Sequence, residues 1–393
     1  MLQTFNQHVV KQRNKALILH TLIDHYPISR ASLAAQTGLN KGTVSSLVSE
    51  LIDEHLILES GPGISSGGRR PVMLLFNQAA GYSIGIDIGV NYILALLTDL
   101  QGKIVIEKKV EIDDTSLDNV LTHLFMVIDE LFENTPKSPY SVIGIGIGVP
   151  ATVNKDGEVL MAPNLHWRNI NLKQMVNDKY DVPVTIHNEA NAGAYGEKRF
   201  GAGKLYKDLI YVSGGIGIGV GLIFNNELYL GEQGLSGELG HMTIQMDGPI
   251  CNCGNQGCWE LYASERALLQ TALKEGVISK DQLYGAFETI IDLAERGDER
   301  TLAVIHQLGK NLAVGLKNMI NIFNPEQIII GNRLAELKKW LHVDLERQLK
   351  SSKLTNPEAV TKLQFSELNK RSAALGVAAF STEYFITMNL ETL

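Results

Sequence analysis

Cysteine is scarce in this sequence, with three residues in 393, and all three fall between positions 251 and 258. Three cysteines cannot pair evenly into disulfides, and such a compact group in a protein of the cytosol points to a metal instead. No apolar run reaches the length that a bilayer requires. The first residues lack the apolar core and the cleavage site of a signal peptide. We therefore expect a cytoplasmic protein without a membrane segment.

Charge is spread unevenly along the chain, whose formal net charge is −8. Residues 1–76 carry seven Lys and Arg against five Asp and Glu, whereas the remainder carries 28 against 38. The hydrophobic content of 45% is that of an ordinary globular protein. Its length allows two or three domains. This distribution suggests that only the N-terminal part meets a polyanion.

The first 76 residues have the pattern of a winged helix-turn-helix. Ser29 is suited to cap a helix over residues 30–37, which ends at Gly38. A second helix is expected over 41–54, because its apolar residues recur at helical spacing. The strand-like runs HLILES and PVMLLFN follow, separated by a glycine-rich tip with two arginines. A plain helical hairpin with a solvated linker is the alternative, but the three elements in this order favour DNA binding.

Short polar and basic side chains of this region are the candidate DNA contacts. Those on the second helix suit base edges and phosphates in a major groove. The paired arginines of the wing suit a narrow, electronegative minor groove. The predicted set is Ser29, Arg30, Lys41, Thr43, Ser45, Ser46, Ser49, Arg69 and Arg70.

From Gly81 onward the sequence has α/β character. The runs YSIGIDIGV, YILALLTDL and KIVIEKKVEI predict a strand meander, followed by a helix near 117–132. SVIGIGIGVPATV predicts a buried strand, and VPVTIHNEANAG predicts a strand that leads into a helix. A hairpin over 209–229, the strand EQIIIGN and a closely packed helix SAALGVAAFST come later. The repeated organisation predicts two lobes with a ligand cleft between them.

We expect three regions. Residues 1–76 form the DNA-binding domain, and residues 77–190 with 370–393 form the first lobe. Residues 191–369 form the second lobe, which holds the metal site and the dimerisation helices.

The cysteine segment carries the most specific chemical signal. His241 precedes Cys251, Cys253 and Cys258. One imidazole and three thiolates make a closed tetrahedral set, which is typical of structural zinc. Buried cysteines beside a core histidine are the alternative, but every cysteine of the chain is gathered here. We therefore expect zinc at these four residues.

Amides and carboxylates occur in turns near the same segment. Each alone is also consistent with a helix cap or a solvated charge. Together they resemble a sugar site, where such groups bind neighbouring hydroxyls. Zinc on one nitrogen of His241 would leave the other nitrogen for a hydroxyl. The predicted sugar contacts are Asn164, Asn188, Glu189, Glu238, His241 and Glu260.

Five stretches make the chain resemble the ROK family of repressors, open reading frames and sugar kinases. They are SSGGRRPVML, GIDIGV, NEANAGAYGE, SGELGHM and CNCGNQGCWELYASE. The resemblance implies an actin-like, hexokinase-like two-lobed fold behind the winged helix-turn-helix, with the zinc and sugar residues given above. It is greatest to bacterial repressors of xylose utilisation. This implies a homodimer on palindromic operator DNA, which is released when D-xylose binds the cleft.

The chain departs from the active kinases of that family at the phosphate loops. They resemble Asp-Ile-Gly-Gly-Thr-Lys at the first loop, whereas residues 87–92 read DIGVNY. Their second loop carries Gly-Thr-Gly, whereas residues 213–215 read SGG, and their later glycine pair is Gly331-Asn332 here. Their catalytic base is an Asp where this chain has Glu189. Displacing a base by about 1 Å costs roughly a hundredfold in rate.

We therefore predict a protein without catalytic residues, which is not an enzyme. Two alternatives stay open. One is a sugar kinase that keeps a DNA-binding head, and the other is a regulator that senses a partner protein instead of a sugar.

Overall fold

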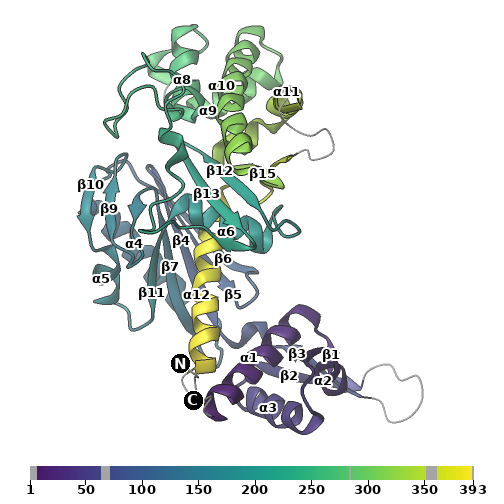
Figure 1. Ribbon diagram of the computed structural model, residues 1–393. Coiled ribbons are helices and arrows are strands. Elements are labelled where there is room, and N and C mark those ends of the chain that lie inside the picture. Colours follow the sequence, from purple (N-terminus) through teal and green to yellow (C-terminus); the bar gives the residue numbers. More distant parts are fainter. Residues whose placement is uncertain (1–6, 63–70, 283–284, 351–360, 392–393) are drawn as a thin grey trace.

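A winged helix-turn-helix head lies at one end of the molecule, and a larger body of sheets and helices lies above it (Figure 1). The computed structural model describes residues 7–62, 71–282, 285–350 and 361–391. The expected fold class, a winged helix-turn-helix followed by a two-lobed α/β body, is confirmed.

The head contains three helices and a small sheet. Its elements are α1 (Gln7–His25), β1 (Ile28–Ser29), α2 (Arg30–Thr37), α3 (Lys41–Asp53), β2 (Ile57–Pro62) and β3 (Val72–Phe76). The strands pair antiparallel in the order β1-β3-β2. Ser29 caps α2 by accepting from the Ser32 amide, and Gly38 ends the helix at φ 70°. Arg69 and Arg70, predicted at the wing tip, lie outside the described residues.

The first sheet of the body contains β4 (Tyr82–Ile88), β5 (Tyr92–Asp99), β6 (Ile104–Glu111), β7 (Val142–Val149) and β11 (Val184–Asn188). Their order is β11-β7-β4-β5-β6. The predicted meander of β4, β5 and β6 is antiparallel, and β7 and β11 add to it in parallel. Helix α4 (Leu117–Glu133) packs into the same core as the isoleucines of β4 and β7.

A small antiparallel sheet extends this lobe. It contains β8 (Thr152–Val153), β9 (Val159–Ala162) and β10 (Trp167–Ile170), in the order β10-β9-β8, and α5 (Leu172–Asn177) follows it. Buried residues on both sides of the β9–β10 loop, such as Ala162 and Leu165, belong to the core of the first sheet. This loop carries Asn164.

The second sheet repeats the plan of the first. Its strands are β12 (Leu209–Gly214), β13 (Ile218–Phe224), β14 (Glu227–Leu228), β15 (Gln327–Gly331) and β16 (Lys362–Phe365). The order β14-β13-β12-β15-β16 again joins three antiparallel strands to two parallel ones. The predicted repeat of the two halves is therefore confirmed.

Helices surround the second sheet in the upper part of the molecule (Figure 1). They are α7 (Glu260–Ala263), α8 (Glu265–Lys274), α9 (Ala286–Glu295), α10 (Glu299–Phe323) and α11 (Lys338–Lys350). Short 3-10 helices occur at η1 (Gln78–Ala80), η2 (Glu238–His241), η3 (Lys280–Gln282), η4 (Asn332–Leu337) and η5 (Asn369–Arg371). None of the described helices combines the length and the apolar character that a bilayer crossing needs.

Two helices, α6 (Glu189–Phe200) and α12 (Ser372–Glu391), pack closely on each other. A Cβ on Gly196 would stand 2.1 Å from the Ser372 carbonyl oxygen, and one on Gly376 would stand 1.8 Å from that of Ala192. Only glycine permits this approach. The lobe boundaries that we predicted at 190/191 and 369/370 fall at the start of α6 and just before α12, and they remain a proposal.

Helix α12 also packs on the first sheet through alternate strand positions. Along β4, Ile84 and Ile86 face α4, while a Cβ on Gly85 would stand 2.0 Å from the Ala374 carbonyl oxygen of α12. Gly146 of β7 is as close to Val377. Glycines and isoleucines that alternate along a strand therefore give the sheet one bulky face and one flat face.

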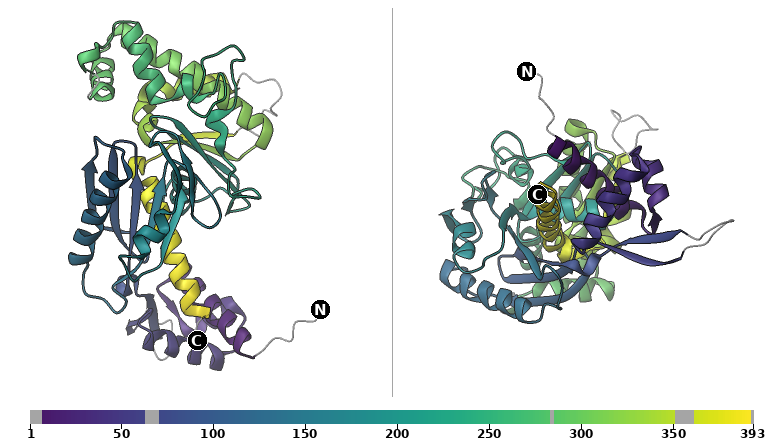
Figure 2. Two further views of the ribbon diagram at one scale, coloured as in Figure 1. Left: turned by 90° about the vertical axis from the view of Figure 1, so that its left-hand side faces the viewer. Right: turned by 90° about the horizontal axis from the view of Figure 1, so that it is seen from below.

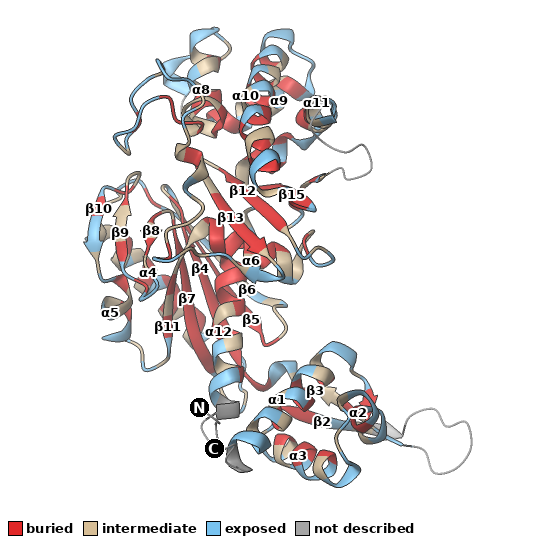
Figure 3. Cartoon of the chain, viewed as in Figure 1, coloured by how far each residue is buried: buried red, intermediate tan, exposed pale blue. Residues whose placement is uncertain are grey.

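The far end of α12 lies beside the head (Figure 2). Ile386 is buried in the core that the head helices form, and Phe385 stacks edge-on against Tyr140. The Tyr140 hydroxyl donates to the carbonyl of Glu54 at the end of α3 (2.8 Å). Residues 372–379 of α12 are buried, and toward the head the helix becomes more exposed (Figure 3). This helix thus connects the junction of the two sheets to the DNA-binding head.

Candidate functional site

A cavity of about 1410 Å³ lies between the two lobes. The first lobe contributes the ends of β4 and β7, the turn before β5 and the β9–β10 loop. The second lobe contributes the β12–β13 turn, η2 and α8. Each of the six predicted sugar contacts lines this cavity. Residues far apart in the sequence are therefore brought to one cleft.

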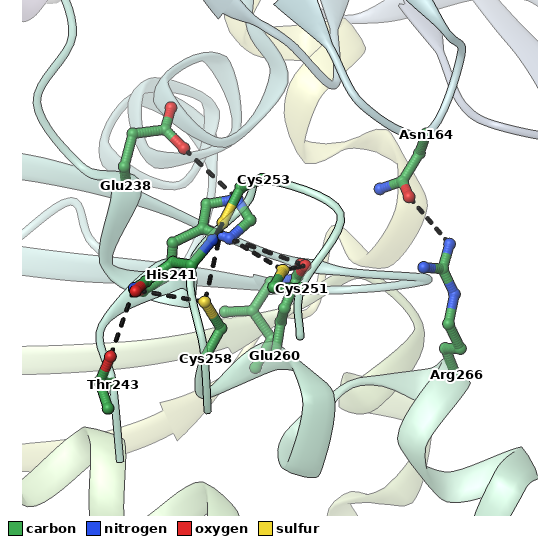
Figure 4. Close-up of polar contacts among 11 residues, drawn as sticks. Asn164, Glu238, His241, Thr243, Cys251, Cys253, Cys258, Glu260 and Arg266 are labelled. Carbon is green, nitrogen blue, oxygen red and sulfur yellow. Dashed lines mark hydrogen bonds and ion pairs between the residues drawn. The ribbon is translucent and has the colours of Figure 1, made fainter. Parts of the chain in front are cut away.

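The predicted metal ligands form one cluster beside the cavity (Figure 4). One donor atom from each of His241, Cys251, Cys253 and Cys258 lies within 4.8 Å of the others. The loop closes tightly because Gly257 has φ 70°, and a Cβ there would stand 1.7 Å from the Gln245 carbonyl oxygen. A neutral imidazole and three thiolates suit a tetrahedral metal ion.

His241 presents one ring nitrogen to the cluster and the other to a carboxylate. Nδ1 lies 3.6 Å from the Cys251 sulfur, and Nε2 lies 3.9 Å from Glu238 Oε2. The main-chain carbonyl of His241 accepts a hydrogen bond from the Asn255 amide (3.1 Å). The ring thus has Nδ1 near Cys251 and Glu260 and Nε2 near Glu238, and all three of these neighbours lie at the edge of the cavity or of the cysteine cluster.

Glu260 and Asn164 converge over the backbone of Gly217. A Cβ on Gly217 would stand 2.6 Å from Glu260 Oε2 and 3.5 Å from Asn164 Nδ2. Asn164 Oδ1 accepts a hydrogen bond of 2.8 Å from Arg266. An amide donor and a carboxylate acceptor therefore share one space that any side chain at position 217 would fill.

Asn188 acts as a helix cap, which is one of the alternatives that its sequence position allowed. Its Oδ1 caps α6 by accepting from the amides of Ala190 (2.9 Å) and Asn191 (3.1 Å). Its Nδ2 donates to the Ala151 carbonyl (2.9 Å). One N–H of the amide is left for a ligand. The cap fixes the turn that places Glu189 at the cavity.

The predicted DNA contacts differ in how exposed their side chains are and in whether they are paired within the protein. Lys41, Ser45, Ser46 and Ser49 are exposed on α3 and Thr43 is half-buried there. The Arg30 guanidinium, by contrast, pairs with Glu59 of β2 (2.6 Å). The Ser29 hydroxyl is buried in its cap. Among the predicted DNA contacts that the structure describes, the exposed side chains thus lie mainly on α3.

Known proteins match both parts of this chain. The model of the ROK family matches residues 83–383, and a winged helix-turn-helix model matches residues 12–57. The chain belongs to the ROK family. It is 46% identical over 382 residues to the xylose repressor of Bacillus spizizenii, which covers 97% of this chain and 98% of that protein.

Two solved ROK structures show the same fold. A ROK family transcriptional regulator, a homolog of the E. coli MLC protein, is 28% identical with a TM-score of 0.80, over 98% of each chain. A ROK family glucokinase from Streptomyces griseus, in complex with glucose and AMPPNP, is 28% identical with a TM-score of 0.69. It covers 77% of this ROK chain and is itself covered completely.

In this ROK chain, a tyrosine packs on the turn between β4 and β5. The Tyr92 hydroxyl donates to Asp87 Oδ2 (2.6 Å). A Cβ on Gly89 would stand 2.3 Å from the Tyr92 ring, so the ring lies directly on the turn. Burial raises the pKa of Asp87 to about 6, although the bond from Tyr92 lowers it. The aromatic ring thus covers the backbone that a phosphate would approach.

Glu189 lies where the two lobes meet. Its Oε1 accepts from the Ser213 hydroxyl (3.0 Å), which in turn accepts from the Asn332 amide (3.2 Å). Burial deep in the cleft is the main cause that raises the pKa of Glu189 to about 8. The neighbouring Asp87 carboxylate is the second cause that raises it. The buried cleft therefore favours the protonated form of this carboxyl group.

Two residues of the site carry no signal in the sequence. Arg266 follows the stretch CNCGNQGCWELYASE directly, and Gly217 is one of several glycines in a hairpin turn. Their importance comes from contacts with Asn164, which is 102 positions from Arg266. Neither spacing nor composition reveals such a contact.

Proposed function

We propose that this protein is a transcriptional repressor of xylose-utilisation genes. It binds a palindromic operator as a homodimer and releases it when D-xylose enters the interlobe cleft. One observation carries this proposal: the similarity to a xylose repressor extends over 97% of the chain. It therefore includes both the DNA-binding head and the sugar cleft.

The metal centre is proposed to hold zinc through His241, Cys251, Cys253 and Cys258. The donor atoms are those that zinc prefers, and their close approach within 4.8 Å fits a single ion. Bound there, zinc supplies a structural cross-link between η2 and the loop before α7. This chain's own residues then do the binding, since His241 Nε2 and the Glu238 and Glu260 carboxylates face the ligand.

The sugar is proposed to bind both lobes together. Asn164, Asn188 and Glu189 offer hydrogen bonds from the first lobe, and Glu238, His241 and Glu260 offer them from the second. A ligand held from both sides stabilises the closed cleft. Helix α12 connects the junction of the lobes to the head, so closure repositions the head and weakens operator binding. By linkage, the operator weakens sugar binding by the same factor.

Phosphoryl transfer is not part of the proposed function. Glu189 stands where the active kinases of the family carry Asp, so its carboxyl group lies one methylene further from the backbone than their catalytic base. Tyr92 also covers the turn at Gly89 where a nucleotide phosphate would need bare backbone. Both observations disfavour the alternative of a sugar kinase with a DNA-binding head.

An operator titration at fixed salt tests the proposal. The full chain is titrated onto labelled operator DNA with D-xylose, L-arabinose, D-glucose or no sugar present. We expect D-xylose to weaken operator binding by about tenfold or more, the size of typical allosteric couplings. An operator affinity that no sugar changes would overturn the proposed response.

Two further assays address the alternatives. Steady release of ADP from Mg-ATP with any of these sugars, at ordinary kinase rates of about 1 to 100 per second, would instead establish a kinase. A regulator that senses a partner protein should give no binding heat with any free sugar.

A further inference from the structure

Arg266 makes a hydrogen bond across the cleft that the proposed function leaves unused. The residue belongs to α8, whose neighbours Ala267 and Leu268 are buried in or beside the core of the second lobe. Its guanidinium donates from Nη2 to Asn164 Oδ1 at 2.8 Å (Figure 4). Asn164 belongs to the first lobe. The bond therefore forms only when the two lobes face each other closely.

The other cations that line the cavity are bound to carboxylates. Arg333 pairs with Glu265 (3.2 Å) and Glu288 (2.7 Å), and Lys370 pairs with Glu336 (3.1 Å). Within the described part of the chain, Arg266 has no carboxylate within ion-pair distance. Its half-buried guanidinium is thus committed to the amide of Asn164 and not to an ion pair.

This commitment determines which end of the amide faces the ligand. A guanidinium can only donate, so the oxygen of Asn164 must point toward Arg266. The amide nitrogen then points toward Gly217, where Glu260 Oε2 also lies. One sugar hydroxyl placed there would accept from Asn164 Nδ2 and donate to Glu260 Oε2, which satisfies both groups.

We propose that Arg266 is a positioning residue of the sugar site. It holds the amide of Asn164 with its NH₂ turned toward Glu260, so that a single hydroxyl is bound by both lobes over the bare backbone of Gly217. The inference rests on the proposed sugar response and adds to it the residue that orients the donor. Arg266 acts through Asn164 and needs no contact of its own with the sugar.

Calorimetry with D-xylose on full-length variants tests this inference. R266A should weaken xylose binding by about tenfold or more, because the amide is then free to turn. R266K keeps one N–H donor and should recover part of the affinity. R296A, which removes an exposed arginine at the end of α9, is the matched control and should bind as the wild type does.

The variant Asn164→Asp separates the loss of the amide donor from the loss of the bond across the cleft. The new carboxylate should pair more strongly with Arg266, yet it has no hydrogen to donate to the sugar. We expect xylose affinity to fall by about tenfold or more although the bond across the cleft is retained. Xylose affinity equal to that of the wild type would overturn the assignment of Asn164 as a donor.

A double-mutant cycle gives the readout that a merely structural role would not produce. If Arg266 acts only through Asn164, R266A combined with N164A should bind xylose no more weakly than N164A alone. Losses that add in full would overturn the inference, as would equal affinities of R266A and the wild type. R266Q replaces R266A in the cycle if R266A does not fold, as judged by thermal melting and sugar-free operator binding.

The two proposals fail in different ways. A wild type that binds none of the sugars overturns the proposed function, and the inference falls with it. A wild type that binds xylose and an R266A variant of equal affinity overturn the inference alone.

Discussion

The two halves of the cleft contain the same kinds of side chain but use them in opposite ways. In the half that holds the cysteine cluster, called the metal half, Glu238 and Glu260 face the cavity next to His241, and Glu260 Oε1 also accepts from the Cys251 thiol (3.2 Å). In the half around the β4–β5 turn, called the turn half, Asp87 is bonded to Tyr92, and Ser213 is bonded to Glu189. An atom that is paired within the protein is less available to a ligand, so Glu189 offers mainly the carboxyl oxygen that Ser213 does not bond. The comparison shows why residue identity alone does not reveal a binding site.

The largest effect is expected from Cys253→Ser, which would break the metal half. The segment that carries Glu238 and His241 depends on the metal for its shape. We expect zinc to be lost and xylose affinity to fall by about 100-fold or more, because orienting partners of a site are worth that much. Elemental analysis and calorimetry measure both effects.

A strong chelator acting on the wild type should reproduce the Cys253→Ser result. An unchanged metal content in the variant would show that the ligand set is wrong.

The next effect concerns the pH dependence of stability and the variant Glu189→Gln. The pKa of Glu189 is raised from 4.5 to about 8, so the protonated form favours folding. Its contribution is complete below pH 4.5 and is lost as pH rises through about 8. Between pH 5 and 8, the free energy of unfolding should fall by on the order of 2 kcal/mol more in the wild type than in E189Q, because cavity water weakens the full effect.

Urea unfolding at several pH values measures this difference. The exposed Glu227 provides the matched control, since E227Q should follow the wild type. Parallel curves for the wild type and E189Q would show that the carboxyl group is not held in its protonated form.

A smaller effect is expected from Glu260→Gln, which tests whether this carboxylate of the metal half binds the sugar. The substitution keeps the shape of the side chain but removes the charged acceptor at Gly217. A hydrogen bond to a charged group is worth about 1.5 to 3 kcal/mol, so xylose affinity should fall by roughly 30-fold. Zinc content should not change. Calorimetry that finds the wild-type affinity would remove Glu260 from the sugar contacts.

The smallest effect is expected from Tyr92→Phe in the turn half of the cleft. The buried Asp87 carboxyl loses its bond from the tyrosine hydroxyl, which should cost about 1 kcal/mol of unfolding free energy. Xylose affinity should stay within about twofold of the wild type, which is within the error of such energies. Urea unfolding and calorimetry test the pair of results. A large loss of xylose affinity would show that the two halves are not independent.

The sequence predicts those features that depend on local patterns. The helix-turn-helix follows from the cap at Ser29 and the glycine at Gly38, and the two sheets follow from strand runs and their repeat. The metal cluster was found because three of its members lie within eight positions. Each signal lies within a short stretch, where the backbone itself sets the distances.

The contacts that determine which polar atoms of the cleft are paired within the protein could not be predicted from the sequence. The bond from Arg266 to Asn164 joins residues that meet only after both lobes have folded and closed. The Tyr92 ring lies on Gly89 because β5 turns back along β4, and Asn188 uses its oxygen as a cap. These outcomes depend on side-chain directions that no residue pattern specifies.

Helix α12 is synthesised last, so the contacts that it makes with earlier parts of the chain form last. The head contains residues 7–62 and 71–76, yet its core is completed by Ile386, and other parts of α12 complete the packing of α6 and of the first sheet. At about 5 to 20 residues per second, roughly 20 to 75 seconds separate the first described residue of the head from Ile386. The contacts between the head and α12 can therefore form only at the end of synthesis, after the other residues of the head core have been made.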